Sequence, residues 1–131
     1  MQIRLASSID LEPLSLLFDL YRQQLHQPSD YPACHAFLKS RLAENDSMIF
    51  VSIRDDEMVG FIQLYPSFSS LCLAPVWYLE DVFVKPLYQH EDVVSQMFQK
   101  AQFLAQSIGV LLISHLRAEV LAEPEQVSCS Q

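Results

Sequence analysis

The spacing of apolar residues changes from strand-like to helical near the middle of the chain, within residues 76–113. Residues 77–84 combine aromatic and β-branched side chains, which is typical of a β-strand. Lys85-Pro86 ends that strand, because proline has no backbone N–H to donate to a ladder. From Glu91 onward the apolar positions recur every three or four residues, which predicts one buried face of a helix: Val93, Val94, Met97, Ala101, Leu104, Ala105 and Ile108.

A second strand is predicted directly after this helix. Gly109 is suited to the helix C-terminus, and residues 110–113 form a short apolar run. Strand, turn, helix and strand together make a βαβ unit. This unit places the helix N-terminus at the mouth of the sheet, where anionic ligands bind.

The first 75 residues predict the remaining layers of the same domain. Residues 3–5 form a short strand, and two amphipathic helices follow, capped by Ser8 or Asp10 and by Asp30. Two strands, 48–53 and 58–65, flank a polar turn and predict a hairpin that Pro66 ends. We therefore expect an α/β (α+β) fold with a mixed, mostly antiparallel sheet flanked by helices. Gly60 indicates a bulge or a close backbone approach.

Composition and charge narrow the classes of function. The chain has 131 residues, half of them hydrophobic, and a formal charge of −8. One domain with one core is expected at this length. The negative charge argues against nucleic acid and against anionic membrane surfaces as partners. No apolar run approaches a membrane span and no signal pattern precedes the first strand, so we expect a cytoplasmic protein.

Recognised catalytic and metal-binding motifs are absent from the sequence. There is no G-x-S-x-G, no phosphate-binding G-x-x-x-x-G-K, no H-E-x-x-H and no Cys-x-x-Cys. We predict no metal site, since His90, Asp92 and His115 lack the usual ligand spacing.

The region around the central strand resembles motif A of the GNAT acyltransferases. Val84, Pro86 and Tyr88 match the family's V-x-P-x-Y, and Gln89 matches the Q or R position that follows. The segments GFIQLYPSFSS and WYLEDVFV are similar to the family's third and fourth strands. The resemblance covers residues 3–115 and implies a GNAT-like domain. It also implies acetyl-coenzyme A as cofactor and N-acyl transfer to a small amine.

The same resemblance implies which residues form the site. Glu80 occupies the place where some members have an acid that faces the acceptor amine, although an acid paired or solvated at a strand bulge is an equal alternative. Tyr21 and Tyr78 are candidates for the substrate pocket, with Tyr21 as plain core and Trp77 in place of Tyr78 as the alternatives. The cofactor-binding positions implied by the family are Val82, Phe83, Val84 and Gln89.

The chain departs from the family in the loop before the helix. His90, Asp92 and Val94 stand where the family has glycines that let backbone N–H groups approach a pyrophosphate. A carboxylate about 4 Å from a phosphate costs on the order of 4 kcal/mol at an effective dielectric near 20. We therefore expect impaired cofactor binding. Alternatively, Glu91 and Asp92 are acids of the first helical turn that suit its dipole and bind nothing.

The segment after the last strand predicts a second departure. We divide the chain into a GNAT-like domain, residues 1–115, and a short tail, residues 116–131, which lacks the family's last strands. No tyrosine follows Tyr88, so the family's usual general acid has no counterpart. The fifth strand would leave an open sheet edge, which a second copy of the chain or the tail would cover. We expect a homodimer, and a non-catalytic binding or self-association module is the alternative function.

Overall fold

The computed structural model describes residues 1–114, with the side chain of His90 left out. Within these residues lie a five-stranded sheet and three α-helices. The strands are β1 (Gln2–Leu5), β2 (Met48–Arg54), β3 (Glu57–Ser69), β4 (Ala74–Val84) and β5 (Leu111–Ser114). The helices are α1 (Leu11–Gln24), α2 (Tyr31–Glu44) and α3 (Val93–Ser107), with 3-10 turns η1 (Ser8–Asp10) and η2 (Pro86–Glu91).

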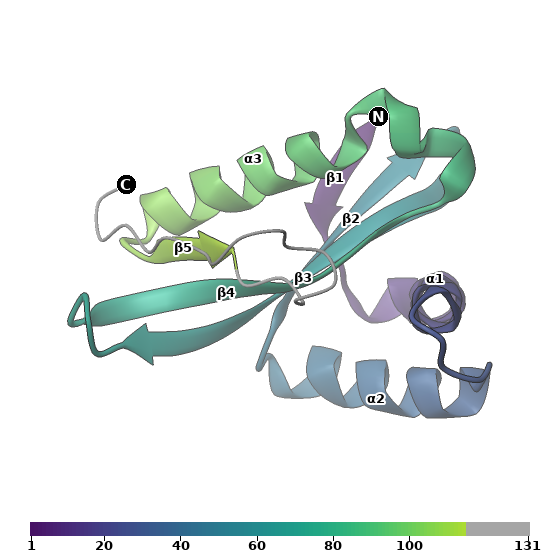
Figure 1. Cartoon of the computed structure of the whole chain (residues 1–131), viewed down its shortest axis with the longest axis horizontal. Coiled ribbons are helices and arrows are strands. Elements are labelled where there is room, and N and C mark those ends of the chain that lie inside the picture. Colours follow the sequence, from purple (N-terminus) through teal and green to yellow (C-terminus); the bar gives the residue numbers. More distant parts are fainter. Residues whose placement is uncertain (115–131) are drawn as a thin grey trace.

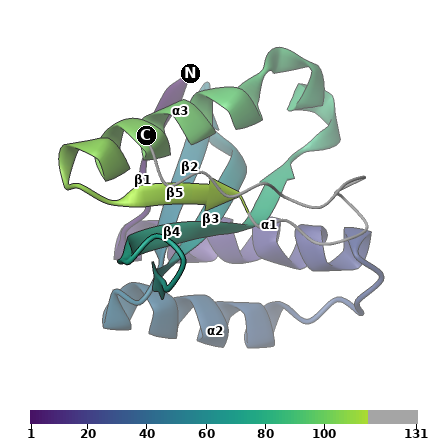
Figure 2. The same cartoon turned by 60° about the vertical axis from the view of Figure 1, so that its left-hand side comes forward.

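The sheet is mixed and its strands lie in chain order. β1 to β4 pair antiparallel with their neighbours, and β5 pairs parallel with β4 after the α3 crossover. α3 covers one face of the sheet and α1 lies against the other, with α2 packed beyond it (Figures 1 and 2). The predicted fold class and the βαβ unit are confirmed. The tail, residues 116–131, lies outside the described residues, and the homodimer stays a prediction.

Strand β3 runs further than the sequence predicts. Pro66 was expected to end it, yet β3 continues to Ser69 and pairs Pro66 with Trp77. The pairing of β2 with β3 stops at Met48 and Leu64, so the continuation has β4 as its strand partner among the described residues. Proline is tolerated there because it sits on an edge, where the N–H it lacks has no ladder partner to lose.

The two faces of the sheet bury separate hydrophobic clusters. On the α1 and α2 side the cluster includes Leu14, Leu17, Phe18, Tyr21, Leu38, Phe61 and Phe83. On the α3 side it includes Phe50, Leu64, Trp77, Leu79, Val84, Val93, Met97 and Ala101. Of the face predicted for α3, Val93, Met97, Ala101 and Ala105 are buried against the sheet and Leu104 is partly buried. The prediction is wrong for Val94 and Ile108, which are exposed, and Ile108 follows the end of α3.

Helices α1 and α2 are joined by a buried carboxylate. Asp19 of α1 accepts hydrogen bonds from the Ser29 hydroxyl at 2.7 Å, the Asp30 backbone N–H at 2.7 Å and the Gln23 amide at 3.1 Å. These donors, the Ser29 hydroxyl first, lower the pKa of Asp19 below its ordinary value. Asp30 in turn caps α2 by accepting from the Ala33 N–H, as the sequence predicts.

The β2–β3 hairpin closes with a two-residue turn. Asp55 and Asp56 both have positive φ, 53° and 64°, as a type I′ turn requires. Gly60 lies nearby on β3, where an added Cβ would stand 2.9 Å from the Phe83 carbonyl oxygen. The register also shifts opposite it, between Ser52 and Ile53. Both features predicted for Gly60 are therefore present.

Candidate functional site

A β-bulge in β4 sets the direction of its two acidic residues. Gln63 pairs with Asp81 and Leu64 pairs with Leu79, so Glu80 has no partner residue on β3. In a regular strand Leu79 and Asp81 would share a face. Instead Leu79 packs on the α3 side, while Asp81 turns toward α1. The inserted residue has rotated the strand, as bulges do beside functional sites.

Asp81 is the centre of a buried polar network. Its two carboxylate oxygens accept hydrogen bonds from the Tyr21 hydroxyl at 2.8 Å and from the Gln63 side-chain amide at 3.0 Å. The Gln63 carbonyl accepts in turn from the Ser47 hydroxyl at 3.1 Å. Gln63 is fully buried and Asp81 is 8% exposed. The network ties α1, β3 and β4 together beneath the bulge.

Glu80 stands in a different environment from its neighbour. It is half-buried, and within the described residues no hydrogen bond or ion pair engages its carboxylate. Tyr65 lies near both acids, and burial, with Asp81 second, raises the pKa of Tyr65 to about 12. The two adjacent acids therefore lie in different environments, since both oxygens of Asp81 accept buried hydrogen bonds.

A cleft lies beside the C-terminal part of β4. Within the described residues β5 pairs with β4 from Val76 to Leu79, and β4 continues to Val84. A cavity of about 330 Å³ lies beside this continuation and the start of α3. It is lined by Gln24, Val82, Phe83, Val84, Gln89, Asp92, Val93 and Val94. All four predicted cofactor-binding residues, Val82, Phe83, Val84 and Gln89, thus line one cavity.

Backbone groups of β4 face this cleft. The Lys85 N–H donates to the Val59 carbonyl of β3 at 2.9 Å. Because the hydrogen-bonding groups of successive strand residues alternate in direction, those of Val82 and Val84 point away from β3. The Gln89 side-chain amide accordingly donates to the Val84 carbonyl at 3.0 Å from the cleft side. An extended ligand can pair with such an edge as an added strand does.

The loop between β4 and α3 differs from the sequence interpretation. Glu91 and Asp92 were read as acids of the first helical turn, but α3 begins at Val93 and its first turn holds no acidic residue. Glu91 ends the 3-10 turn η2, and Asp92 is the N-cap with φ 59° and ψ 29°. Asp92 thus adopts the left-handed conformation that glycine takes most readily.

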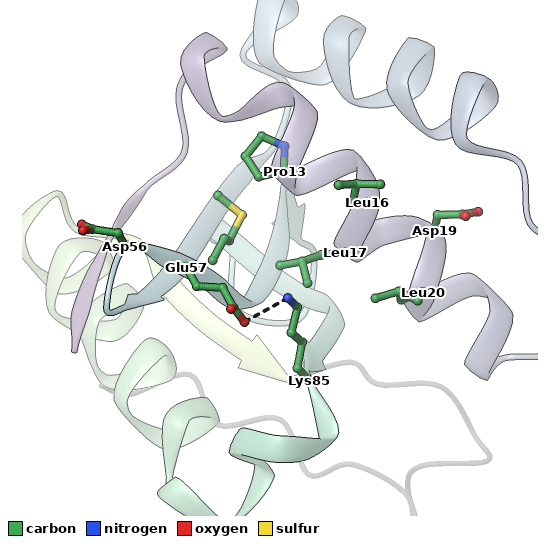
Figure 3. Close-up of a pocket in the computed structure, with 9 residues that line it drawn as sticks. Pro13, Leu16, Leu17, Asp19, Leu20, Asp56, Glu57 and Lys85 are labelled. Atoms are coloured by element: carbon green, nitrogen blue, oxygen red, sulfur yellow. Dashed lines mark hydrogen bonds and ion pairs between the residues drawn. The ribbon is translucent and has the colours of Figure 1, made fainter.

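Two ion pairs hold this loop to the β2–β3 hairpin. Arg54 pairs with Glu91, and Lys85 pairs with Glu57 at 3.1 Å. Glu57 and Lys85 also line a larger cavity, of about 490 Å³, between α1 and the hairpin turn (Figure 3). Its apolar wall comes from Pro13, Leu16, Leu17, Leu20 and Met58, and its polar lining from Asp19, Asp56, Glu57 and Lys85.

The candidate pocket residues fall on both sides of the sheet. Tyr21 is buried in the α1 cluster and bonded to Asp81, so it is both core and part of the acidic site. Trp77 packs in the α3 cluster. Tyr78 is half-buried, opposite Tyr65 on β3 and Ile113 on β5. Of the residues that the structure describes, no three His, Cys, Asp or Glu side chains are grouped to hold a metal ion.

Sequence reasoning missed Asp81 and Gln63. Both lie in apolar strand segments, where a polar residue on the buried face is an anomaly. Two polar residues in neighbouring apolar strands could have suggested a buried hydrogen bond between them. The bulge that turns Asp81 toward Gln63, however, depends on the register of β3 and β4. Register is a property of two strands together and is weakly encoded in either one.

Comparison with known proteins identifies the family. The model of the Acetyltransferase (GNAT) family matches residues 12–123. The chain is 33% identical to a probable acetyltransferase of Haemophilus influenzae over 103 residues, 78% of this chain and 70% of that protein. It is 41% identical to an uncharacterised N-acetyltransferase of Bacillus subtilis over 86 residues, 66% of this chain and 58% of that protein. The match therefore spans less than two thirds of the Bacillus relative.

A solved structure agrees with this result. The crystal structure of a probable acetyltransferase superposes with a TM-score of 0.84 and 33% identity, covering 94% of this chain and 82% of that one. The chain belongs to the GNAT acetyltransferase family. Within residues 1–114, none of the helices combines the length and apolar character needed to cross a membrane.

Proposed function

We propose that this protein transfers an acetyl group from acetyl-coenzyme A to a small amine. The observation that carries the proposal is the cleft of about 330 Å³ between the C-terminal part of β4 and the start of α3. The family generally uses acetyl-coenzyme A, and this cleft lies among the residues that the family resemblance assigns to it. A half-buried acid, Glu80, stands at the adjacent bulge.

The residues present fit the cofactor. The outward backbone groups of Val82 and the N–H of Val84 offer a strand edge to the amide-containing pantetheine arm, while the Val84 carbonyl accepts from Gln89. The Asp92 side chain does not cap α3, so the N–H groups of the first turn can be offered to the pyrophosphate. Asp92 adopts the left-handed backbone conformation that a glycine would take at this position. Compared with a glycine loop, this loop therefore keeps that backbone conformation and carries one additional negative charge. We therefore expect binding that is weaker than a glycine loop would give.

Glu80 is proposed as the group that accepts the proton of the attacking amine. An ammonium must lose a proton before nitrogen can attack a carbonyl, and bound acetyl-coenzyme A supplies that carbonyl as a thioester. Within residues 1–114 no hydrogen bond or ion pair engages the Glu80 carboxylate at the bulge. Asp81 instead holds the bulge in place through Tyr21 and Gln63, since both of its oxygens accept buried hydrogen bonds.

The test is a turnover assay that measures release of the free coenzyme A thiol with a panel of small primary amines. We expect Glu80→Gln to lower kcat/KM by about 100-fold, within the usual contribution of a general base, while acetyl-coenzyme A still binds. Glu57→Gln makes the same chemical change on the hairpin and is the control. No turnover with any amine by the unmodified protein, together with no cofactor binding, would favour the non-catalytic module.

A further inference from the structure

The acidic loop before α3 is fastened to the β2–β3 hairpin by paired charges. The tight turn at Asp55 and Asp56 sets Arg54 opposite Glu57 across the hairpin. From there Arg54 reaches Glu91 at the end of η2, and Glu57 reaches Lys85 at the end of β4 (the second pair is drawn in Figure 3). Each pair joins one hairpin residue to one residue of the segment that borders the cleft.

The position of Glu91 gives its ion pair a chemical consequence. Glu91 lies in the chain between Gln89 and Asp92, and both of these line the cleft. Its side chain is 24% exposed, so its charge is only partly screened by water. An unpaired carboxylate here would repel a pyrophosphate at the start of α3. Paired with a guanidinium, the same carboxylate contributes little net field.

We propose that Arg54 is a positioning residue for the cofactor, which neutralises Glu91 so that the acidic loop accepts the pyrophosphate of acetyl-coenzyme A. The inference rests on the proposed function, because it concerns the anionic part of the same ligand. It assigns to the β2–β3 hairpin a role that its surface charges alone do not indicate. A cluster of exposed charges at a hairpin turn is ordinarily a solvated surface.

A charge role and a purely mechanical one predict the same result for Arg54→Ala and different results for Glu91→Gln. If Arg54 acts by neutralising Glu91, Arg54→Ala exposes the carboxylate and weakens binding. Glu91→Gln instead removes the repulsive charge and leaves Arg54 available, so binding is equal or tighter. If the pair only fastens the loop, both substitutions break the same contact and both weaken binding.

The experiment measures Kd for acetyl-coenzyme A by calorimetry, and kcat and KM with one amine, at low and high salt. We expect Arg54→Ala to raise Kd and the cofactor KM about tenfold at low salt with little change in kcat, and the effect to shrink at high salt. Glu91→Gln should not raise Kd. The double variant should return to within about threefold of the unmodified protein, and Arg54→Lys should retain most affinity. Glu57→Gln, which breaks the other pair, is the matched control.

The outcomes separate this inference from the proposed function. Equal weakening by Arg54→Ala and Glu91→Gln, with normal binding by the unmodified protein, overturns the role of Arg54 and leaves the proposed function standing. Loss of kcat rather than affinity in Arg54→Ala overturns it too. If the unmodified protein does not bind acetyl-coenzyme A, both the proposed function and this inference are overturned.

Discussion

The two acidic regions of the site are held by opposite physical means. At the bulge, Asp81 is 8% exposed and both of its oxygens accept hydrogen bonds from buried groups of α1 and β3. At the loop, Glu91 is paired with Arg54, whose side chain is 42% exposed. Asp81 is held in place because breaking its hydrogen bonds would leave buried polar groups unpaired, which costs free energy. Glu91 is held by a solvent-exposed ion pair, which contributes little net free energy.

This difference teaches where the site tolerates change. The Asp81 carboxylate in the core fixes the strand geometry at the bulge, so its replacement should destabilise the fold. The charged side chains of the loop form exposed ion pairs, so substituting them should have little effect on the free energy of unfolding. Substitutions at the bulge should therefore register first as lost stability, and substitutions at the loop as altered ligand affinity.

The largest expected effect is at the bulge. Asp81→Ala should lower the free energy of unfolding by about 3 kcal/mol, because it removes the charged acceptor of two buried hydrogen bonds and leaves the buried Gln63 amide unsatisfied. Glu80→Ala, one residue away, should stay within about 0.5 kcal/mol, as half-exposed positions usually do. Urea denaturation of both variants checks this. Equal losses would show that the network is not what holds the bulge.

The next effect concerns the buried carboxylate that joins α1 to α2. Asp19→Asn should cost about 2 kcal/mol, since one charged acceptor is replaced by a group that also carries donors. The pKa of Asp19 is lowered in the folded state, so its contribution is present above the ordinary value of 3.8 and is lost as pH falls through the folded value. Stability should therefore fall less on acidification below about pH 4 in Asp19→Asn than in the unmodified protein.

A smaller effect is expected where the loop carries backbone strain. Asp92→Gly should raise the free energy of unfolding by about 0.5 kcal/mol, because relief of the left-handed conformation is partly offset by the freer unfolded chain. Thermal or urea unfolding measures it. A clear loss of stability would mean that the Asp92 side chain holds the loop by a contact worth more than the strain.

The smallest effect on stability should come from the ion pair itself. Arg54→Ala should change the free energy of unfolding by about 0.5 kcal/mol or less, as is usual for exposed pairs. A denaturation curve that shifts by several times that amount would place Arg54 with the structural network of the bulge and would remove the contrast between the two regions.

Much of the fold was predictable from local pattern. The α3 periodicity, the Gly109 C-terminus and the Asp30 cap follow from rules that act within one turn of chain. The family motif around Val84 and Gln89 likewise identified the residues that line the cleft. These features are local, so the sequence carries them directly.

The features that were missed depend on contacts between distant segments. Pro66 was read as a strand end, because its edge position follows from where β2 stops. Asp81 was passed over in favour of Glu80, since the bulge that separates their directions is set by the register with Gln63 and Leu64. The ion pair of Glu91 was not predicted, because its partner Arg54 lies on the β2–β3 hairpin, far from it in the sequence.

The most direct test of the account is a calorimetric titration of acetyl-coenzyme A into the purified protein, with Asp92→Gly beside it. We expect the unmodified protein to bind in the micromolar range, about −8 kcal/mol, and Asp92→Gly to bind more tightly because it removes one charge beside the pyrophosphate. Absence of binding by both proteins would contradict the assignment of the cleft between β4 and α3 as the cofactor site.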